Sequence, residues 1–131
     1  MWRRARTGLV GGALAASLAA GPAVACSCAF PQSPAQHLEI SDVVFKGRVL
    51  RSSGDISRAA TTFRVETALK GKAAGELTVD HTVPGAACGL TFTPGETTLV
   101  FAYRSQGKLW TNACSRARFT EAEYRAALDR R

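Results

Sequence analysis

The stretch SDVVFKGRVLRSS, residues 41–53, decides the fold. Its apolar residues Val43, Phe45 and Val49 alternate with polar neighbours, which is the period-two pattern of a strand with one buried face. Gly47 lies in the middle of this pattern, where a glycine indicates a bend or a bulge, common where a strand curls around a small barrel. The stretch therefore predicts a curled strand.

Four further short strands are expected downstream. Residues 61–71 repeat the alternation, with Phe63 and Val65 on the inner face. The other three are expected within residues 76–83, 93–105 and 106–115, marked in turn by Leu77, Val79 and His81, by Leu99, Phe101 and Tyr103, and by Trp110. His81 is interpreted as a half-buried strand residue rather than a ligand, and Trp110 as a core residue.

A helix is expected on each side of the strands. Ser33 as N-cap, Pro34 at the first position and Gln36 in a capping box open the first helix. Thr120 opens the second over residues 121–131. The predicted fold class is mainly β, a five-stranded OB-fold barrel with a short N-terminal helix, a C-terminal helix and two disulfides. A β-sandwich is the alternative, but it needs more strands.

The first 25 residues read as a secretory signal. A basic segment with three arginines precedes an apolar run at 8–20, and AVA at 23–25 forms a cleavage site. That run is too short and too rich in Gly and Ala for a transmembrane anchor, and no later run is long enough to span a bilayer. We expect residues 1–25 to be a signal peptide and residues 26–131 to be one secreted domain.

Two variants of export remain open. Arg3 and Arg4 fit a twin-arginine signal, which ranks second to a general secretory signal. A lipoprotein signal would also place a cysteine directly after cleavage, although Ala23 stands where such signals usually carry Leu. A lipid anchor on Cys26, with the protein held at the cell envelope, is thus the minor alternative. A lipidated Cys26 would be a thioether and could form no disulfide.

The charge excludes one class of partner. The chain has 17 basic and 10 acidic residues, a formal charge of +7, and cleavage removes three arginines to leave +4. That mildly basic balance is compatible with acidic surfaces. It contains no basic run of the kind that binds nucleic acid, so no nucleic-acid partner is expected.

Cysteine usage predicts two disulfides. An even number of cysteines in an oxidising compartment favours a disulfide framework. Pairing Cys26 with Cys28 would close a strained ring across one residue, which leaves two patterns, each tying both N-terminal cysteines to distant parts of the chain. A metal site is not expected, because the spacing is not C-x2-C and neither histidine of the domain falls at a ligand spacing. The cysteines are Cys26, Cys28, Cys88 and Cys114.

The residues that could support catalysis do not form a pattern. No nucleophile–base pair, carboxylate pair or metal cluster emerges, so the protein is not expected to be an enzyme or to hold a cofactor. Oligosaccharide or single-strand binding on the barrel face would rest on fold analogy alone. The remaining carboxylates are interpreted as caps and solvated faces: Glu39, Asp42, Asp80 and Glu96.

The motifs of the mature chain occur in a characteristic order. Cys-x-Cys is followed by a short helix leading into SDVVFKGRV, then KG, CG, PGETTLVFA and a last cysteine after the fifth strand. This order resembles the netrin-like (NTR) domain, in particular the N-terminal inhibitory domain of the tissue inhibitors of metalloproteinases, over the mature chain up to Cys114. The resemblance implies an OB-fold barrel and the pairing Cys26–Cys88 and Cys28–Cys114.

The resemblance also implies a mechanism. In this family the α-amine and the carbonyl oxygen of the first cysteine chelate the catalytic zinc of a metalloprotease, and the next side chain enters the pocket beside the metal. A catalytic zinc keeps an open position that such a bidentate donor can occupy. The implied inhibitory residues are Cys26, Ser27 and Cys28, with Gly85, Ala86 and Ala87 as a secondary contact loop.

The expected function is therefore secreted inhibition of a zinc metalloprotease through Cys26. The alternative is a non-inhibitory extracellular or envelope-attached NTR-type protein-binding module, in which Cys-x-Cys is only a disulfide staple.

Overall fold

The computed structural model describes residues 26–55, 58–83 and 88–131. The expected signal peptide and the expected contact loop Gly85, Ala86 and Ala87 lie outside these residues. The elements are α1 (Pro34–Ile40), β1 (Val43–Gly54), β2 (Arg58–Lys70), β3 (Glu76–Thr82), β4 (Thr97–Ser105), β5 (Lys108–Trp110), the 3₁₀ turn η1 (Ala113–Ser115) and α2 (Glu121–Asp129).

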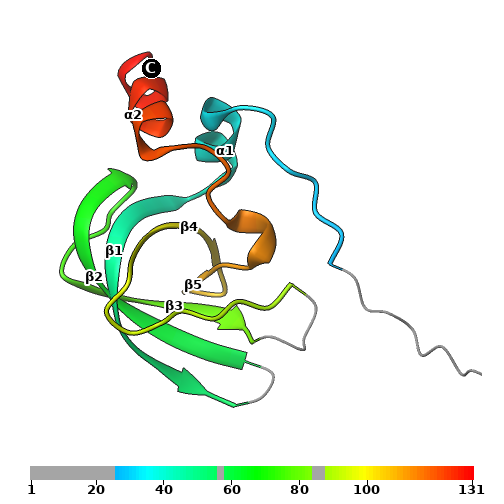
Figure 1. The fold of residues 1–131 in the computed structure, drawn as a ribbon, viewed down its shortest axis with the longest axis vertical. Coiled ribbons are helices and arrows are strands. Elements are labelled where there is room, and N and C mark those ends of the chain that lie inside the picture. Colours follow the sequence, from blue (N-terminus) through cyan, green and yellow to red (C-terminus); the bar gives the residue numbers. More distant parts are fainter. Residues whose placement is uncertain (1–25, 56–57, 84–87) are drawn as a thin grey trace, which may run out of the picture.

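The five strands form a closed barrel in the order β1-β2-β3-β5-β4, with β1 pairing β4 to complete the ring (Figure 1). All neighbours are antiparallel except β3 and β5, which are parallel. This is the five-stranded OB-fold arrangement, and it confirms the predicted fold class. The two helices lie side by side over one end of the barrel.

β1 has two buried faces in its first half. Val43, Phe45 and Val49 point into the barrel as predicted, while Val44 packs beneath the helices. The pairing with β2 shifts register between Lys46 and Gly47, which confirms the expected bulge. A side chain at Gly47 would collide with its neighbours, because a Cβ there would lie 2.8 Å from Cε2 of Phe45.

β4 and β5 differ from the sequence-based assignment. Val100 and Ala102 of β4 fill the barrel, whereas Leu99 and Phe101 face the helices, so this strand too is buried on both sides. Tyr103, expected to continue the apolar face, is 38% exposed because it lies beyond the cover of the helices. Trp110 is only half-buried, so its assignment to the core was wrong.

In β5 it is Leu109 that fills the barrel. The Trp110 ring lies beneath Arg58, whose guanidinium carbon is 4.9 Å from the ring centroid. Its indole N–H donates to the carbonyl oxygen of Ser105 at 3.2 Å.

The end of β2 holds α1 against the barrel. Ser33 caps the start of α1 by accepting a hydrogen bond from the Gln36 amide, as predicted. The expected capping box is not formed, because Oε1 of Gln36 accepts from the Gln32 amide, one residue before the N-cap. At the other end, Nζ of Lys70 donates to the carbonyl oxygens of Leu38 at 2.6 Å and Ser41 at 2.5 Å. A cation at the carboxyl end of a helix also suits the helix dipole. Neither α1 nor α2, the α-helices of the described residues, has the length and apolar character needed to cross a membrane.

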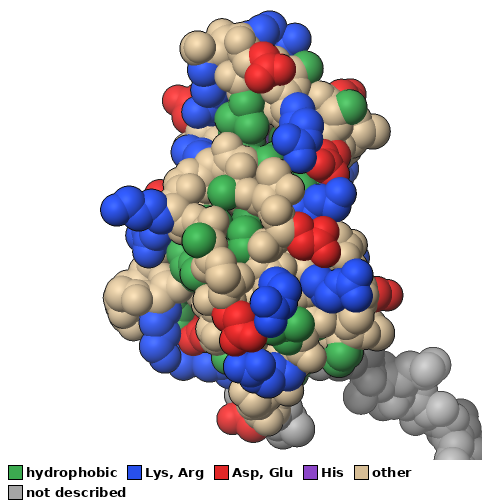
Figure 2. Space-filling model, turned by 90° about the vertical axis from the view of Figure 1, so that its left-hand side faces the viewer, with side chains coloured by type: hydrophobic (Ala, Val, Ile, Leu, Met, Phe, Trp, Pro, Cys, Tyr) green, Lys and Arg blue, Asp and Glu red, His purple; other side chains and the backbone are tan. Residues whose placement is uncertain are grey.

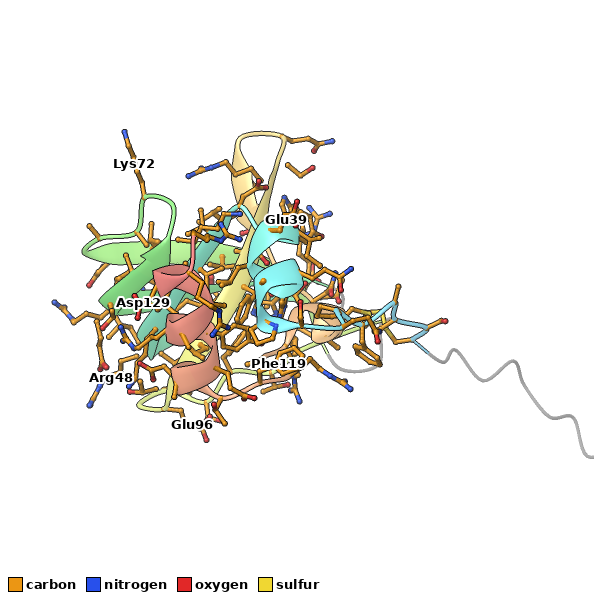
Figure 3. All side chains as sticks on the ribbon, turned by 90° about the horizontal axis from the view of Figure 1, so that it is seen from above. Glu39, Arg48, Lys72, Glu96, Phe119 and Asp129 are labelled. Carbon is orange, nitrogen blue, oxygen red and sulfur yellow. A yellow bond between two sulfur atoms is a disulfide. The ribbon has the colours of Figure 1, made fainter. Side chains whose placement is uncertain are left out.

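Position 71, directly after Lys70, requires glycine for two reasons. Gly71 has a φ of +72°, and a Cβ there would lie 2.6 Å from the Asp42 carbonyl oxygen. The Lys-Gly pair thus ends β2, holds α1 and lets the chain turn toward β3, where Lys72 extends away from the barrel (Figure 3).

We expect Gly47→Ala to destabilise the barrel by about 1–3 kcal/mol, the usual cost of overpacking a core. The added methyl must displace Phe45 or Phe63, whose Cβ would be 3.2 Å away. Denaturant unfolding measures the effect. Arg51→Ala on the same strand is the control, because its ion pair with Glu76 is exposed and should contribute less than about 1 kcal/mol. Equal stability of Gly47→Ala and the wild type would show that Phe45 and Phe63 can make room for the methyl group without cost, and would contradict the prediction.

Candidate functional site

The segment before α1 is tied to the barrel by two disulfides, Cys26–Cys88 and Cys28–Cys114, with Cα separations of 5.0 and 5.3 Å. This is the pairing that the resemblance implies, and one of the two patterns left open by the residues alone. Cys88 directly follows the loop that lies outside the described residues, while Cys114 lies in η1 after β5. Both anchors thus lie on the same side of the barrel as the N-terminal segment.

The same segment is also held without covalent bonds. The guanidinium of Arg118 stacks on the Phe30 ring at 3.7 Å, Pro31 is buried, and the amide of Gln32 donates to Oε1 of Gln36 at 2.6 Å. Cys26 and Ser27 remain exposed beyond these contacts. The first described residues are therefore anchored by these contacts and exposed to solvent. Figure 3 shows the segment before α1 extending away from the helix.

All four cysteine sulfurs lie together, which the sequence analysis did not predict. Their Sγ atoms are all within 4.8 Å of one another. The spacing along the chain could not reveal this cluster, because it depends on two anchors brought together by barrel closure. In the oxidised protein these sulfurs carry no proton and make packing contacts.

His37 on α1 connects the helices to the disulfide region. Its ring is 1% exposed, stacks on Phe101 at a centroid distance of 3.8 Å and places Nδ1 2.8 Å from Oη of Tyr124. That oxygen already accepts hydrogen bonds from the amides of Arg118 and Phe119. The Tyr124 hydroxyl therefore donates to an unprotonated Nδ1, so the imidazole is neutral.

Burial is the main cause that holds the pKa of His37 below its usual 6.5. A hydrogen bond to the Ser115 carbonyl raises this pKa, and the positive charge of Arg118 lowers it. Because Ser115 follows Cys114, the neutral imidazole joins α1, α2 and the second disulfide into one structural unit.

α2 is fastened to β1 from its first turn. Glu121 pairs with Lys46 at 3.1 Å and with Arg125 at 2.7 Å, and hydrogen bonds from Arg125 and then Lys46 are the main causes that lower the pKa of its carboxyl. Glu123 completes the capping box with Thr120, whose backbone and hydroxyl hydrogen bonds lower the Glu123 pKa. These interactions keep the helix that carries Tyr124 over His37.

A second candidate surface lies along β4. β1 pairs with β4 from Thr97 to Ala102, but β5 pairs with it only from Tyr103 to Ser105. The other edge of Thr97–Ala102 therefore has no strand partner among the described residues. A groove of about 270 Å³ includes residues of that edge, and its lining also includes Leu90, Phe92, Arg116 and Ala117.

The hydrogen-bonding direction along β4 defines what faces this groove. The Ala102 carbonyl accepts from the Asp42 amide just before β1, and the register between β1 and β4 has no shift from Thr97 to Ala102, so the backbone groups of Ala102 and of residues in phase with it face β1. Phe101 faces the opposite way, since its carbonyl accepts a hydrogen bond from the Thr111 hydroxyl at 2.8 Å. Leu99, in the same phase as Phe101, directs its amide into the groove.

The other residues singled out from the sequence have structural roles. His81 is buried inside the barrel rather than half-buried, with Nε2 2.7 Å from the Thr61 hydroxyl. Asp42 accepts from the amide of Arg104 at 2.7 Å, and Asp80 pairs with Lys108 at 3.6 Å. Lys and Arg side chains are spread over the face in Figure 2 with acidic side chains among them.

No protein-family model matches the chain, and no curated protein matches it. The assignment of a function therefore depends on the geometry of the two surfaces above and on the motifs of the chain.

The buried imidazole predicts a pH-dependent stability. Because the folded pKa of His37 lies below 6.5, the unfolded state binds more protons, and stability that is present above pH 6.5 is lost as the pH falls through the folded pKa. Glu121 and Glu123 add losses only below their ordinary pKa of 4.5. We expect His37→Phe to be less stable than the wild type at neutral pH. Its free energy of unfolding, measured with urea, should change little between about pH 7 and pH 5, whereas that of the wild type should fall. An unchanged slope in this variant would assign the pH dependence to other groups.

Proposed function

We propose that the mature protein is a secreted inhibitor of a zinc metalloprotease and that Cys26 occupies the open position on the protease zinc. The observation that carries this proposal is an exposed Cys26 at the point where an A-x-A cleavage site would create a new N-terminus, held there by Cys26–Cys88 and Cys28–Cys114. The order of motifs that resembles the NTR family supports it.

The chain would contribute a rigid bidentate donor. The α-amine and the carbonyl oxygen of Cys26 form a five-membered chelate with the metal, and an α-amine with an ordinary pKa near 7.7 to 8.0 loses its proton readily to a metal. Ser27 would point into the pocket beside the zinc, where its short side chain gives little selectivity. Because the segment is anchored by two disulfides, by Phe30 and by Pro31, little conformational entropy is lost on binding.

The proposal predicts that one added residue abolishes inhibition. An Ala placed before Cys26 moves the α-amine by about 3.8 Å, out of the chelate ring. Inhibition constants against a panel of zinc metalloproteases should show inhibition by the chain beginning at Cys26 and none by the extended chain. Ser27→Ala, which keeps the amine, is the matched control and should still inhibit. Disulfide mapping and circular dichroism should be identical for all three forms.

Two outcomes would overturn the proposal that Cys26 inhibits a protease by binding its zinc. One is equal inhibition with and without the added Ala. The other is an exported protein whose mass and N-terminal analysis show a lipidated or extended Cys26, since neither presents a free α-amine.

The groove along β4 favours a second candidate, a protein-binding module that does not inhibit. The edge of Thr97–Ala102 has no strand partner among the described residues, so an extended peptide could pair with it in the mode called β-strand addition. The Leu99 amide would be the donor to the peptide, whereas the Phe101 carbonyl already accepts from the Thr111 hydroxyl. The partner on this account is an unfolded or loop segment of another protein, with alternate side chains contacting Leu90 and Phe92. In this case the N-terminal disulfides would only stabilise the barrel.

Blocking the groove separates the two candidates. Ala117→Arg places a long side chain on the wall of the groove, whereas Ala126→Arg, on the exposed face of α2, is the matched control. If the protein is a binding module, a library of extended peptides should shift the amide NMR signal of Leu99 in the wild type and the control but not in Ala117→Arg. Peptide-induced shifts away from β4, or none, would remove this candidate.

A further inference from the structure

The four sulfurs form a compact cluster whose members belong to different disulfides. Sγ of Cys26 lies 3.5 Å from Sγ of Cys28 and 3.3 Å from Sγ of Cys114, and the Cys88 and Cys114 sulfurs are 3.7 Å apart. We infer that reduction of the two disulfides converts this cluster into a four-thiolate site for one Zn²⁺ ion. The inference does not rest on the inhibitory function, which uses the oxidised protein and the α-amine.

The distances suit a tetrahedral zinc site. With Zn–S bonds of about 2.3 Å, the sulfurs of a four-thiolate site are about 3.8 Å apart. Three of the four sulfur–sulfur distances between different disulfides, 3.3, 3.5 and 3.7 Å, already approach this length, and the fourth is within 4.8 Å. Only the two bonded sulfur pairs must separate, and Cα separations of 5.0 and 5.3 Å allow this by rotation about the Cα–Cβ bonds.

The backbone around the cysteines is held by contacts that survive reduction. On the N-terminal side, Phe30 stacks under Arg118 and Pro31 is buried. On the barrel side, Oδ1 of Asn112 accepts from the Cys114 amide at 2.9 Å. The amide of Ala113 donates to the Cys88 carbonyl at 3.0 Å, which joins the two barrel-side ligands. Breaking the disulfides therefore leaves the four ligands close together.

The positive charge around the cysteines favours the zinc-bound, four-thiolate form of the reduced chain. Four thiolates and one Zn²⁺ carry a net charge of −2. Arg116 and Arg118 follow Cys114 closely, and Arg118 packs on the N-terminal segment itself. Cations near a thiolate cluster stabilise its charge.

The reaction balances with a dithiol as the reductant. Each protein disulfide takes two electrons and two protons from one dithiol, which becomes a disulfide, and the protein gains two thiols. Zinc then displaces the four thiol protons. Reoxidation of both pairs removes four electrons and releases the ion, so zinc is held only by the reduced chain.

Cobalt(II) titration of the reduced protein without oxygen tests the site. We expect one Co²⁺ per chain, visible bands of a tetrahedral four-thiolate centre, and displacement of the cobalt by one equivalent of Zn²⁺. The oxidised protein should bind neither ion. Cys26→Ser, Cys28→Ser, Cys88→Ser and Cys114→Ser should each lose the four-thiolate spectrum, and Ser27→Ala, between two ligands, should keep it.

Circular dichroism and amide exchange of the same samples make each outcome informative. A reduced chain that keeps the barrel, or that recovers it when zinc is added, supports a built site. The inference is wrong if the wild type binds no metal at micromolar concentration or binds it through fewer than four thiolates. It is also wrong if any single Cys→Ser variant retains the wild-type spectrum, or if metal binds only to an unfolded chain.

Discussion

The fold depends on β1, which must pair with β2 on one side and β4 on the other while bending through the barrel wall. This double pairing closes the ring, and the space at Gly47 is filled by the Phe45 ring and the Cβ of Phe63, so that no side chain fits there without displacing them. Closure then places Cys88 beside η1, which carries Cys114, and the Ala113 amide of η1 donates to the Cys88 carbonyl. The position of the N-terminal segment therefore follows from the curvature of one strand.

The features that sequence predicts well here are local. The bulge at Gly47, the inward positions of Phe45 and Phe63, and the helix caps at Ser33 and Thr120 depend on near neighbours in the chain, and the structure has all of them. Five strands and two helices of about the expected extents followed from the same patterns.

The misassigned features depend on tertiary contacts. Trp110 looks like core by composition, but β5 has only three residues and its one inward position belongs to Leu109. β4 is covered on both faces because two helices pack on the barrel, which an alternating pattern cannot indicate. The burial of His37 and the gathering of the four sulfurs likewise require elements far apart in sequence. For the N-terminal segment, the sequence therefore predicted the cysteines and their pairing through the resemblance, but not the arrangement of the four sulfurs in space.

The separations of the two disulfides set an order of events during synthesis. Cys26 and Cys28 leave the ribosome first, yet their partners follow 62 and 86 residues later. During that interval the thiols of Cys26 and Cys28 are both present without their partners. A disulfide between them would be strained, because only Ser27 separates them, and this strain disfavours premature local pairing. The Cys26–Cys88 bond can form before β4 and β5 are made, whereas the Cys28–Cys114 bond must wait until β5, the last strand of the barrel, has been synthesised.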